Sequence, residues 1–452
     1  MAANVFWTCM PRYPNPEDKV NCMGTNAKTL RNANAMPAPT WHYLRMNDTE
    51  ISIPGDLSVA PAVSSMVAED VIAPAGMFEF SLAMLQRWWE TAHPQDSRRQ
   101  AGLAAARAAD AGATYGGTAQ SRYQLRADAV EAANSLEEPF ETGVGAEVAE
   151  LLRQAAGEPL VVASGEGQTA NALVTVQGAD GAFSAAAIDV VAAMDSTVNL
   201  DVVVDSPDAR ASSQGFTGTT IRVIAGFGAR VNIRRMQTLD AGFCDIDDMG
   251  FVTADGARVQ VAQTVLGGQR TSTGLACDLR GSESRIDIDL HYLGHDTQDH
   301  DFNYVVRHHG ARTECDIQAS GVLSGTSQKI LRGTIDLIRG CKGARGNERE
   351  SVLLVDEGVR NRTVPVILCN EDDVAGNHGA TIGHVNAEQL RYLQARGLSE
   401  AQAEALFLES SFDHALQHAP SEQAAAGVDR LACAVLGQSV LLRDLEQDEG
   451  AE

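Results

Sequence analysis

The middle of the chain alternates between apolar and polar residues in short runs. Arg258–Val261 and Arg285–Leu290 place an apolar side chain at every second position, and this period of two is typical of strands with one buried face. Gly, Asp and Ser separate such runs from about residue 158 to 373, and no long helical pattern interrupts them. The pattern predicts a mainly β region and argues against a βαβ fold.

A turn followed by an arginine recurs before these strands. Arg230, Arg258, Arg285 and Arg312 each follow a Gly-Ala or Glu-Ser pair, and they are 28, 27 and 27 residues apart. A steady period of this size in an all-β region indicates a stacked β-solenoid, whose coils bury their inward faces on one another. The alternative is a chance recurrence of Gly-Ala-Arg in a chain rich in Ala and Arg.

Helical patterns flank the β region. Gly145–Ala156 places Val148 and Leu152 on one face, and Ser399 with Gln402 forms a capping box that opens a later helix. The predicted organisation is a mixed and helical N-terminal region, a solenoid core and a C-terminal helical region. Their bounds are 1–157, 158–383 and 384–452.

The composition is that of a globular, acidic chain. Hydrophobic residues make up 44% and charged residues 21%, and the net charge is −25. This charge argues against nucleic-acid binding and against an anionic membrane surface, since both require clustered Lys and Arg. The eight cysteines are scattered without a CxxC pair, and no export signal or apolar run of about 18 residues is evident. We therefore expect a cytoplasmic protein with reduced thiols.

Two polar segments could carry chemistry. The first spans 291–310 and is rich in histidine, but its spacing matches no compact zinc pattern, so turn and surface histidines are the preferred interpretation. The second joins the β region to the C-terminal helices, and its thiol, imidazole and carboxylate groups suit iron. Its candidate residues are Cys369, Glu371, Asp372, Asp373, His378 and His384. The alternative for this second segment is a capped domain boundary without a ligand.

Signatures of common enzymes are absent from the sequence. There is no Walker A motif and no GxSxG elbow, and the G-x-G forms near 165 and 226 do not continue as a dinucleotide fingerprint. The chain is therefore not expected to be an enzyme.

The stretch from Ala319 to Gly397 resembles the SufB/SufD family of the SUF iron–sulfur cluster assembly system. The resemblance rests on SGVLSGTSQKILRGTIDLIRG, ERESVLLVDEGVRNRTVPVILCNEDDVAGNHGATIG and EQLRYLQARGLSEAQAEALFL. It implies a right-handed parallel β-helix between helical ends, a complex with a SufB paralogue and the SufC ATPase, and SufC docking on the C-terminal helices. A transient iron–sulfur cluster would form where the two β-helices meet.

The resemblance also assigns residues. His378 matches the family histidine implicated in cluster assembly, and Cys369 is a possible second ligand. SufB-type chains carry a cysteine where this chain reads Arg349–Ser351, and a Glu where it has Gly379. Both departures favour the SufD type. Some SufD chains have a cysteine where this chain has Gly376. Because this chain lacks that cysteine, the resemblance gives less support to a thiolate beside His378.

The predicted function is a non-catalytic SufD-like scaffold subunit. One alternative is a SufB-like scaffold that works as a homodimer, and another is a β-helix enzyme acting on polysaccharides. The sequence gives no indication for or against a flavin.

Overall fold

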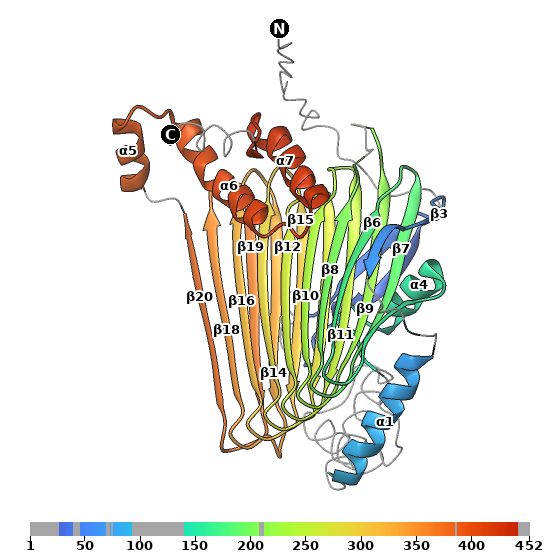
Figure 1. Ribbon diagram of the computed structural model, residues 1–452. Coiled ribbons are helices and arrows are strands. Elements are labelled where there is room, and N and C mark those ends of the chain that lie inside the picture. The colour runs from blue at the N-terminus through green and yellow to red at the C-terminus, as the bar shows by residue number, and fades with distance from the viewer. Residues whose placement is uncertain are drawn as a thin grey trace, which may run out of the picture. The chain divides into compact units, whose positions relative to one another are not determined.

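The computed structural model describes residues 27–38, 46–68, 73, 76–92, 140–207, 212–384 and 387–441 (Figure 1). The chain divides into two compact units, and the smaller one is Gly76–Glu141. Its described helix, α1 (Met77–Ala92), packs Phe78 edge-to-face on Phe140 at 5.3 Å between ring centroids. The sequence, rich in Ala, Leu and Arg, also predicts helix from about Gly76 to Gln120, and the part of this range after Ala92 lies outside the described residues. The larger unit comprises the rest of the chain and is the subject below.

Two parallel sheets form the body of the larger unit, and successive strands alternate between them. Each strand pairs with the strand two places later in the chain, which is the connectivity of a parallel β-solenoid. The predicted mainly β fold, with a parallel β-helix between helical flanks, is therefore confirmed. At the N-terminal end β4 joins the first sheet antiparallel to β6, whereas β3 joins the second sheet parallel to β7.

The first sheet has the strand order β20-β18-β16-β14-β12-β10-β8-β6-β4. Its strands are β4 (Val63–Ala68), β6 (Thr169–Gln177), β8 (Thr197–Asp205), β10 (Arg230–Thr238), β12 (Arg258–Val265), β14 (Arg285–Gly294), β16 (Glu314–Leu323), β18 (Arg345–Leu354) and β20 (Ala375–His384).

The second sheet has the order β19-β17-β15-β13-β11-β9-β7-β3, and β5 also pairs with β7. Its strands are β3 (Ser58–Pro61), β5 (Leu160–Ser164), β7 (Ala182–Ala192), β9 (Gly215–Ala225), β11 (Phe243–Thr253), β13 (Arg270–Leu279), β15 (Asp299–His308), β17 (Gln328–Leu337) and β19 (Arg360–Cys369). A separate antiparallel pair consists of β1 (Lys28–Ala33) and β2 (Thr49–Ile53).

The arginine repeat reflects the true register of the coils, with one exception. Arg230, Arg258 and Arg285 are direct partners on adjacent strands, but the next partner is Glu314 rather than Arg312. Arg312 lies in the preceding turn with a φ of 56°. The Arg285 guanidinium donates to the Glu314 carboxylate at 2.7 Å, so the column of like charges ends in an ion pair.

The inward-facing residues form columns of apolar side chains that run through the stack. One column contains Leu200, Ile233, Val261, Ile288 and Ile317, which are partners on successive strands and are buried. Each coil thus covers the inward face of the previous coil, and the buried apolar area holds the stack together.

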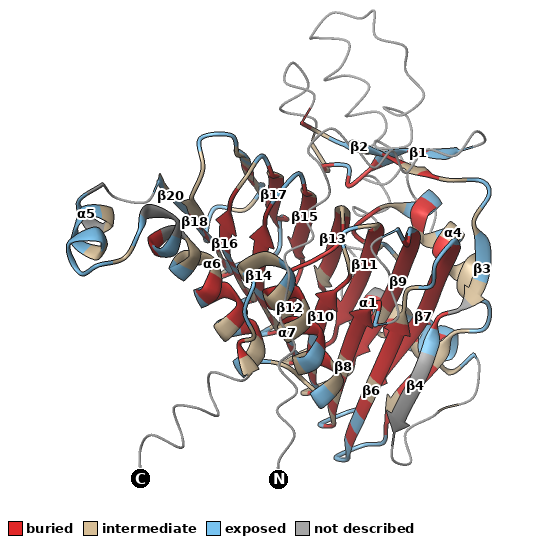
Figure 2. Cartoon of the chain, turned by 90° about the horizontal axis from the view of Figure 1, so that it is seen from above, coloured by how far each residue is buried: buried red, intermediate tan, exposed pale blue. Residues whose placement is uncertain are grey.

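Helices cover part of each outer face. The helix α4 (Ala146–Ala156) buries Val148 and Leu152 against the second sheet, as the sequence predicted. On the first sheet, α6 (Glu400–Gln417) and α7 (Glu422–Leu436) pack on the carboxyl ends of the strands (Figure 1). The predicted capping box at Ser399 is confirmed. Figure 2 shows that burial is concentrated in the central strands, whereas β20 and α5 (Ala387–Ala395) are exposed.

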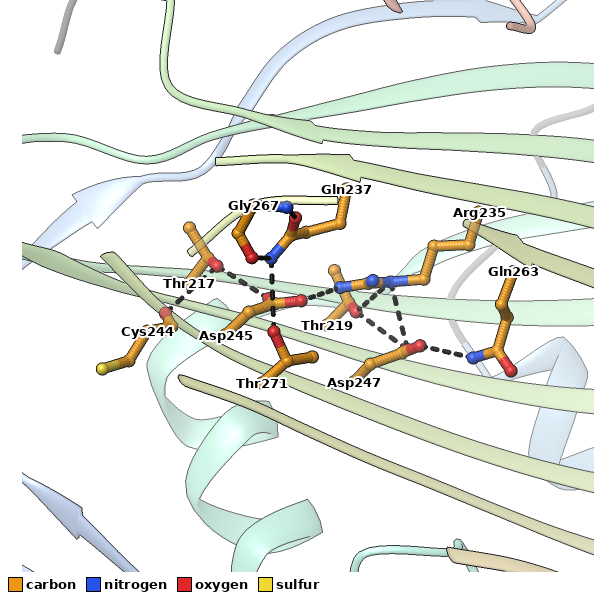
Figure 3. Close-up of polar contacts among 10 residues, drawn as sticks. All are labelled: Thr217, Thr219, Arg235, Gln237, Cys244, Asp245, Asp247, Gln263, Gly267 and Thr271. Carbon is orange, nitrogen blue, oxygen red and sulfur yellow. Dashed lines mark hydrogen bonds and ion pairs between the residues drawn. The ribbon is translucent and has the colours of Figure 1, made fainter. Parts of the chain in front are cut away.

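A buried ionic network interrupts the apolar interior (Figure 3). The Arg235 guanidinium contacts the carboxylates of Asp245 at 2.6 Å and Asp247 at 3.2 Å, and all three side chains are fully buried. The Gln263 amide donates to Asp247 at 2.7 Å. Burial raises the pKa of Asp247 to about 6, although Arg235 opposes this shift. The charges are tolerated because each has a partner.

We predict that Arg235→Met lowers the free energy of unfolding by about 3–5 kcal/mol, because it leaves two buried carboxylates without a cation. The matched control is Arg234→Met, on the same strand as Arg235. It removes a half-exposed ion pair with Asp201 of the neighbouring strand β8. It should cost less than about 1 kcal/mol. Urea unfolding of both variants measures the difference, and equal losses would contradict the assigned role of the network.

Candidate functional site

The last coil, formed by β19 and β20, has no further coil stacked on it among the described residues. The residues of β20 are exposed or half-buried throughout its length. Its inward positions include His378, Ala380 and Ile382, because these are the partners of Glu348, Glu350 and Val352 on β18. Ile382 is 46% exposed although it faces inward. The interior of the solenoid is therefore open at this end.

The chemistry of one inward column changes at the open end. The column is apolar from Leu200 to Ile317, and its next two positions are Glu348 and then His378. A carboxyl group and an imidazole thus replace aliphatic side chains in the last two coils. Neither adds to the apolar packing that stabilises the other coils.

Glu348 is a buried carboxyl group without a cationic partner among the described residues. Its residue is 3% exposed, and its Oε2 atom has no hydrogen-bond partner. The carboxyl lies against Gly333, where an added Cβ would stand 2.3 Å from Oε1. Burial and the nearby Glu350 raise the pKa of Glu348 to about 7, while Lys329 acts in the opposite direction.

The neighbouring carboxylate, Glu350, is fully satisfied. Lys329 forms an ion pair with it, and both side chains are buried. Thr363 also donates a hydrogen bond to Glu350, and the Tyr292 hydroxyl donates at 3.4 Å. Asn361 is the partner of Lys329 on β19, and its side-chain amide has no hydrogen-bond partner on either atom. Among the described residues of the last two coils, buried side-chain polar atoms thus remain without a hydrogen-bond partner on Glu348, Asn361 and Thr334.

The structure places both predicted ligands on the last coil but does not join them directly. Cys369 ends β19 and its thiol donates to the Glu371 carbonyl at 3.2 Å. His378 lies within β20. Gly376, which lies between these two residues in the sequence, packs close to Ile367. A Cβ added to Gly376 would stand 3.1 Å from the Cγ2 atom of Ile367. A ligand pair of Cys369 and His378 therefore stays a prediction.

The acidic residues of the same segment shape the turn. The Glu371 carboxylate accepts from the backbone N–H groups of Gly340 at 2.8 Å and Asp372 at 3.1 Å, and these bonds lower its pKa. The backbone N–H of Gly343 donates to the carbonyl of Asp373. These contacts agree with a capped boundary at the turn between β19 and β20. The column that contains Glu348 and His378 is not part of this turn.

The interpretation of the 291–310 histidines as turn and surface residues was wrong for His300 and His308, which lie within β15. His295 and His309 lie in the connections on either side of β15 but are not at the surface. His295, His300, His308 and His309 are buried. His300 bonds the Leu293 carbonyl, and His308 contacts Thr313 and the Cys315 thiol inside the solenoid. Burial lowers the pKa of His300 to about 4 and that of His308 to about 3. Both are neutral core residues at physiological pH.

His291 belongs to a different environment, a polar groove of about 860 Å³ on the outer face of the first sheet. It stacks on His414 of α6 at 4.2 Å between ring centroids. Asn171, Asn199 and Asn232 form a ladder along the groove, with hydrogen bonds of 2.7 and 2.8 Å. Because these amides bond one another, the ladder is explained by coil stacking.

The sequence analysis missed Glu348, Glu350 and Lys329. A signal for two of them is present, since Glu348 and Glu350 share the strand face of Val352 and Leu354 in the run RGNERESVLL. Charged residues at apolar positions of an alternating strand indicate either a buried network or a site. Among the described residues, no group of three or more His, Cys, Asp or Glu side chains is placed to hold a metal ion. Within the same ranges, no helix has the length and apolar character that a membrane crossing requires.

We predict that Glu348→Gln stabilises the protein at pH 8 but not at pH 4.5. The folded pKa of Glu348 is raised to about 7 from 4.5, so the folded state holds a proton that the unfolded state has lost. Stability of the natural chain therefore falls as pH rises from about 4.5 to 7. The amide removes this loss, worth up to about 3 kcal/mol above pH 7. Chemical unfolding across this pH range measures the gain, and a gain independent of pH would contradict the buried, unpaired carboxyl.

Comparison with known proteins identifies the family. Residues 173–411, more than half of the chain, match the family described as SUF system FeS cluster assembly, SufBD core domain. The iron–sulfur cluster assembly protein SufD of Bacillus subtilis is 26% identical over 187 residues, which are 41% of this chain and 43% of the relative. An iron–sulfur cluster assembly SufBD family protein of Mycobacterium tuberculosis is 25% identical over 213 residues, which are 47% of this chain and 25% of the relative.

The chain thus spans less than half the length of these curated relatives. The matched region includes most of the stacked coils, the open end and the start of the C-terminal helices. The chain belongs to the SufBD family of the SUF system for iron–sulfur cluster assembly.

Proposed function

We propose that this chain is a non-enzymatic scaffold subunit of the SUF complex, of the SufD type. The observation that carries the proposal is the uncovered last coil, whose inward face presents His378 and Ile382. An open solenoid end exposes apolar side chains and unpaired strand backbone, which favours pairing with another chain. The occupant proposed here is the coil stack of a SufB-type paralogue.

The assignment to the SufD type is supported by two positions. Arg349 stands in the strand where SufB-type chains carry a cysteine, and its guanidinium pairs with Asp316 on the outer face. Gly379 follows His378, so the chain supplies no carboxylate there. The proposed partner would provide the ligands that this chain lacks, and a transient iron–sulfur cluster would form at the joint.

The C-terminal helices are the proposed docking site for the SufC ATPase. Tyr392 on α5 is 58% exposed and Leu406 on α6 is 40% exposed, which offers apolar contacts to a partner. The remainder of α6 and α7 is fastened to the solenoid, and Arg430 bonds Asp205 at 2.6 Å. Movement of a bound ATPase would thus be transmitted to the strands. We place the complex in the cytoplasm, in keeping with the free thiols of all six cysteines in the described ranges.

We predict that Ile382→Asp lowers the affinity for the SufB-type partner at least about tenfold, because a carboxylate would be buried in the joint. The control is Thr381→Asp on the outer face of the same strand, which should pair normally. Co-expression with the neighbouring genes, co-purification and mass measurement of the complex provide the test. A complex of two identical chains would support the homodimeric alternative instead.

We predict that His378→Ala leaves the complex intact but abolishes most cluster formation. The imidazole is exposed at the open end, so its removal costs little packing. Anaerobic iron and sulfide analysis of the reconstituted complex gives the measurement. Unchanged cluster formation would reject a ligand role for His378.

A further inference from the structure

Glu348 differs from the other buried charges described near the open end because it has no counter-ion. Lys329 is already paired with Glu350, and Thr363 and Tyr292 complete the hydrogen bonds of that carboxylate. Glu348 keeps an oxygen without a partner in a residue that is 3% exposed. A buried carboxylate in this condition is costly unless a proton or a cation neutralises it.

The side chain next to Glu348 in its column is His378. The two residues are direct partners on β18 and β20, and adjacent strands are spaced by about 4.8 Å. Both lie at inward positions, and His378 occupies the last coil, where the solenoid is open. Carboxylate oxygen and imidazole nitrogen are both ligands for divalent metal ions, and these two side chains start from neighbouring positions of one column.

The opposite wall leaves room for the carboxyl group. Gly333 of β17 has no side chain, and a Cβ there would stand 2.3–2.5 Å from the carboxyl atoms of Glu348. The carboxyl therefore depends on a glycine on the facing strand for its position. A side chain introduced at Gly333 would therefore displace the carboxyl group of Glu348 without changing its charge.

We propose that Glu348 and His378 form a half-site for a ferrous ion, with Glu348 as the inner ligand and His378 as the outer one. The ion would supply the positive charge that Glu348 lacks. No third His, Cys, Asp or Glu of the described residues completes the group, so most coordination positions remain for water, sulfide or the partner subunit. Such partial coordination suits an ion that is handed on rather than stored. The inference rests on the proposed function and adds to it one ligand, Glu348, that is not among the residues predicted from the sequence.

The test is an anaerobic calorimetric titration of the isolated full chain with Fe²⁺. Glu348→Gln and His378→Gln should each weaken binding at least about tenfold, the effect of losing about 1.4 kcal/mol. Gly333→Ala should weaken it while every charge is kept. The matched control, Glu314→Gln, removes a carboxylate paired with Arg285 on the outer face and should bind Fe²⁺ as the natural chain does.

Two outcomes would overturn the half-site: Glu348→Gln binding Fe²⁺ as tightly as the natural chain, or no binding by the natural chain. Thermal unfolding of Glu348→Gln, measured beside the titration, shows whether the variant is folded, and only a folded variant with weakened binding supports the half-site. Co-purification with the partner is measured separately on the same variants. Failure of the natural chain to pair rejects the proposed function, whereas normal pairing with unchanged Fe²⁺ binding in Glu348→Gln rejects the half-site alone.

Discussion

The parallel register between successive coils is the constraint on which the rest of the structure depends. Direct partners recur from strand to strand, so side chains at one register position stack in a column, and one such column stays apolar from Leu200 to Ile317. This regularity makes the interior close-packed and places polar groups at defined heights along it. Among the residues that the structure describes, no strand covers the last coil, and β20 presents the same kind of backbone edge as every earlier strand. The open end is therefore a direct consequence of the interaction that stabilises the stack.

The buried charges of the solenoid fall into two groups with different consequences. Arg235 is enclosed with two carboxylates and lies on β10, which has five strands of its sheet on one side and three on the other, so its network lies in the middle of the stack. Glu348 lies one coil from the end and has no such partner. Glu348 lowers the stability of the folded chain at neutral pH and makes no ion pair that would offset this cost. Such costly groups are expected more often at functional sites than elsewhere. The contrast between them supports the proposal that chemistry takes place at the end of the solenoid rather than in its middle.

Much of the fold could be predicted from the sequence because its determinants are local. Alternation at period two located the strands, and Val148 and the Ser399 capping box located two helices. The prediction that Arg312 is the next member of the arginine repeat was wrong. Only the pairing of β14 with β16 shows that the partner of Arg285 is Glu314. The burial of Asp301 was not predictable, since its partners are Arg332 and Asn34, which are far apart in the sequence. Glu348 was visible as a charge on an apolar strand face, but alternation alone does not tell which coil is the last.

The position of His378 and Glu348 relates the proposed pairing to the proposed iron half-site. A partner coil stacked on β20 would cover Ile382 and enclose His378, so an ion held there would be shielded from water. Enclosure strengthens the attraction between an ion and its ligands, but it also prevents exchange. Loading and release would then require the joint to open, and α6 and α7 are fastened to the same sheet through residues such as Phe412 and Arg430. A force applied to these helices would act on strands that end in the coil stack beneath the joint. In the proposed complex, an ATPase docked on these helices would thus lie apart from the proposed ligands, while both would act on the same sheet.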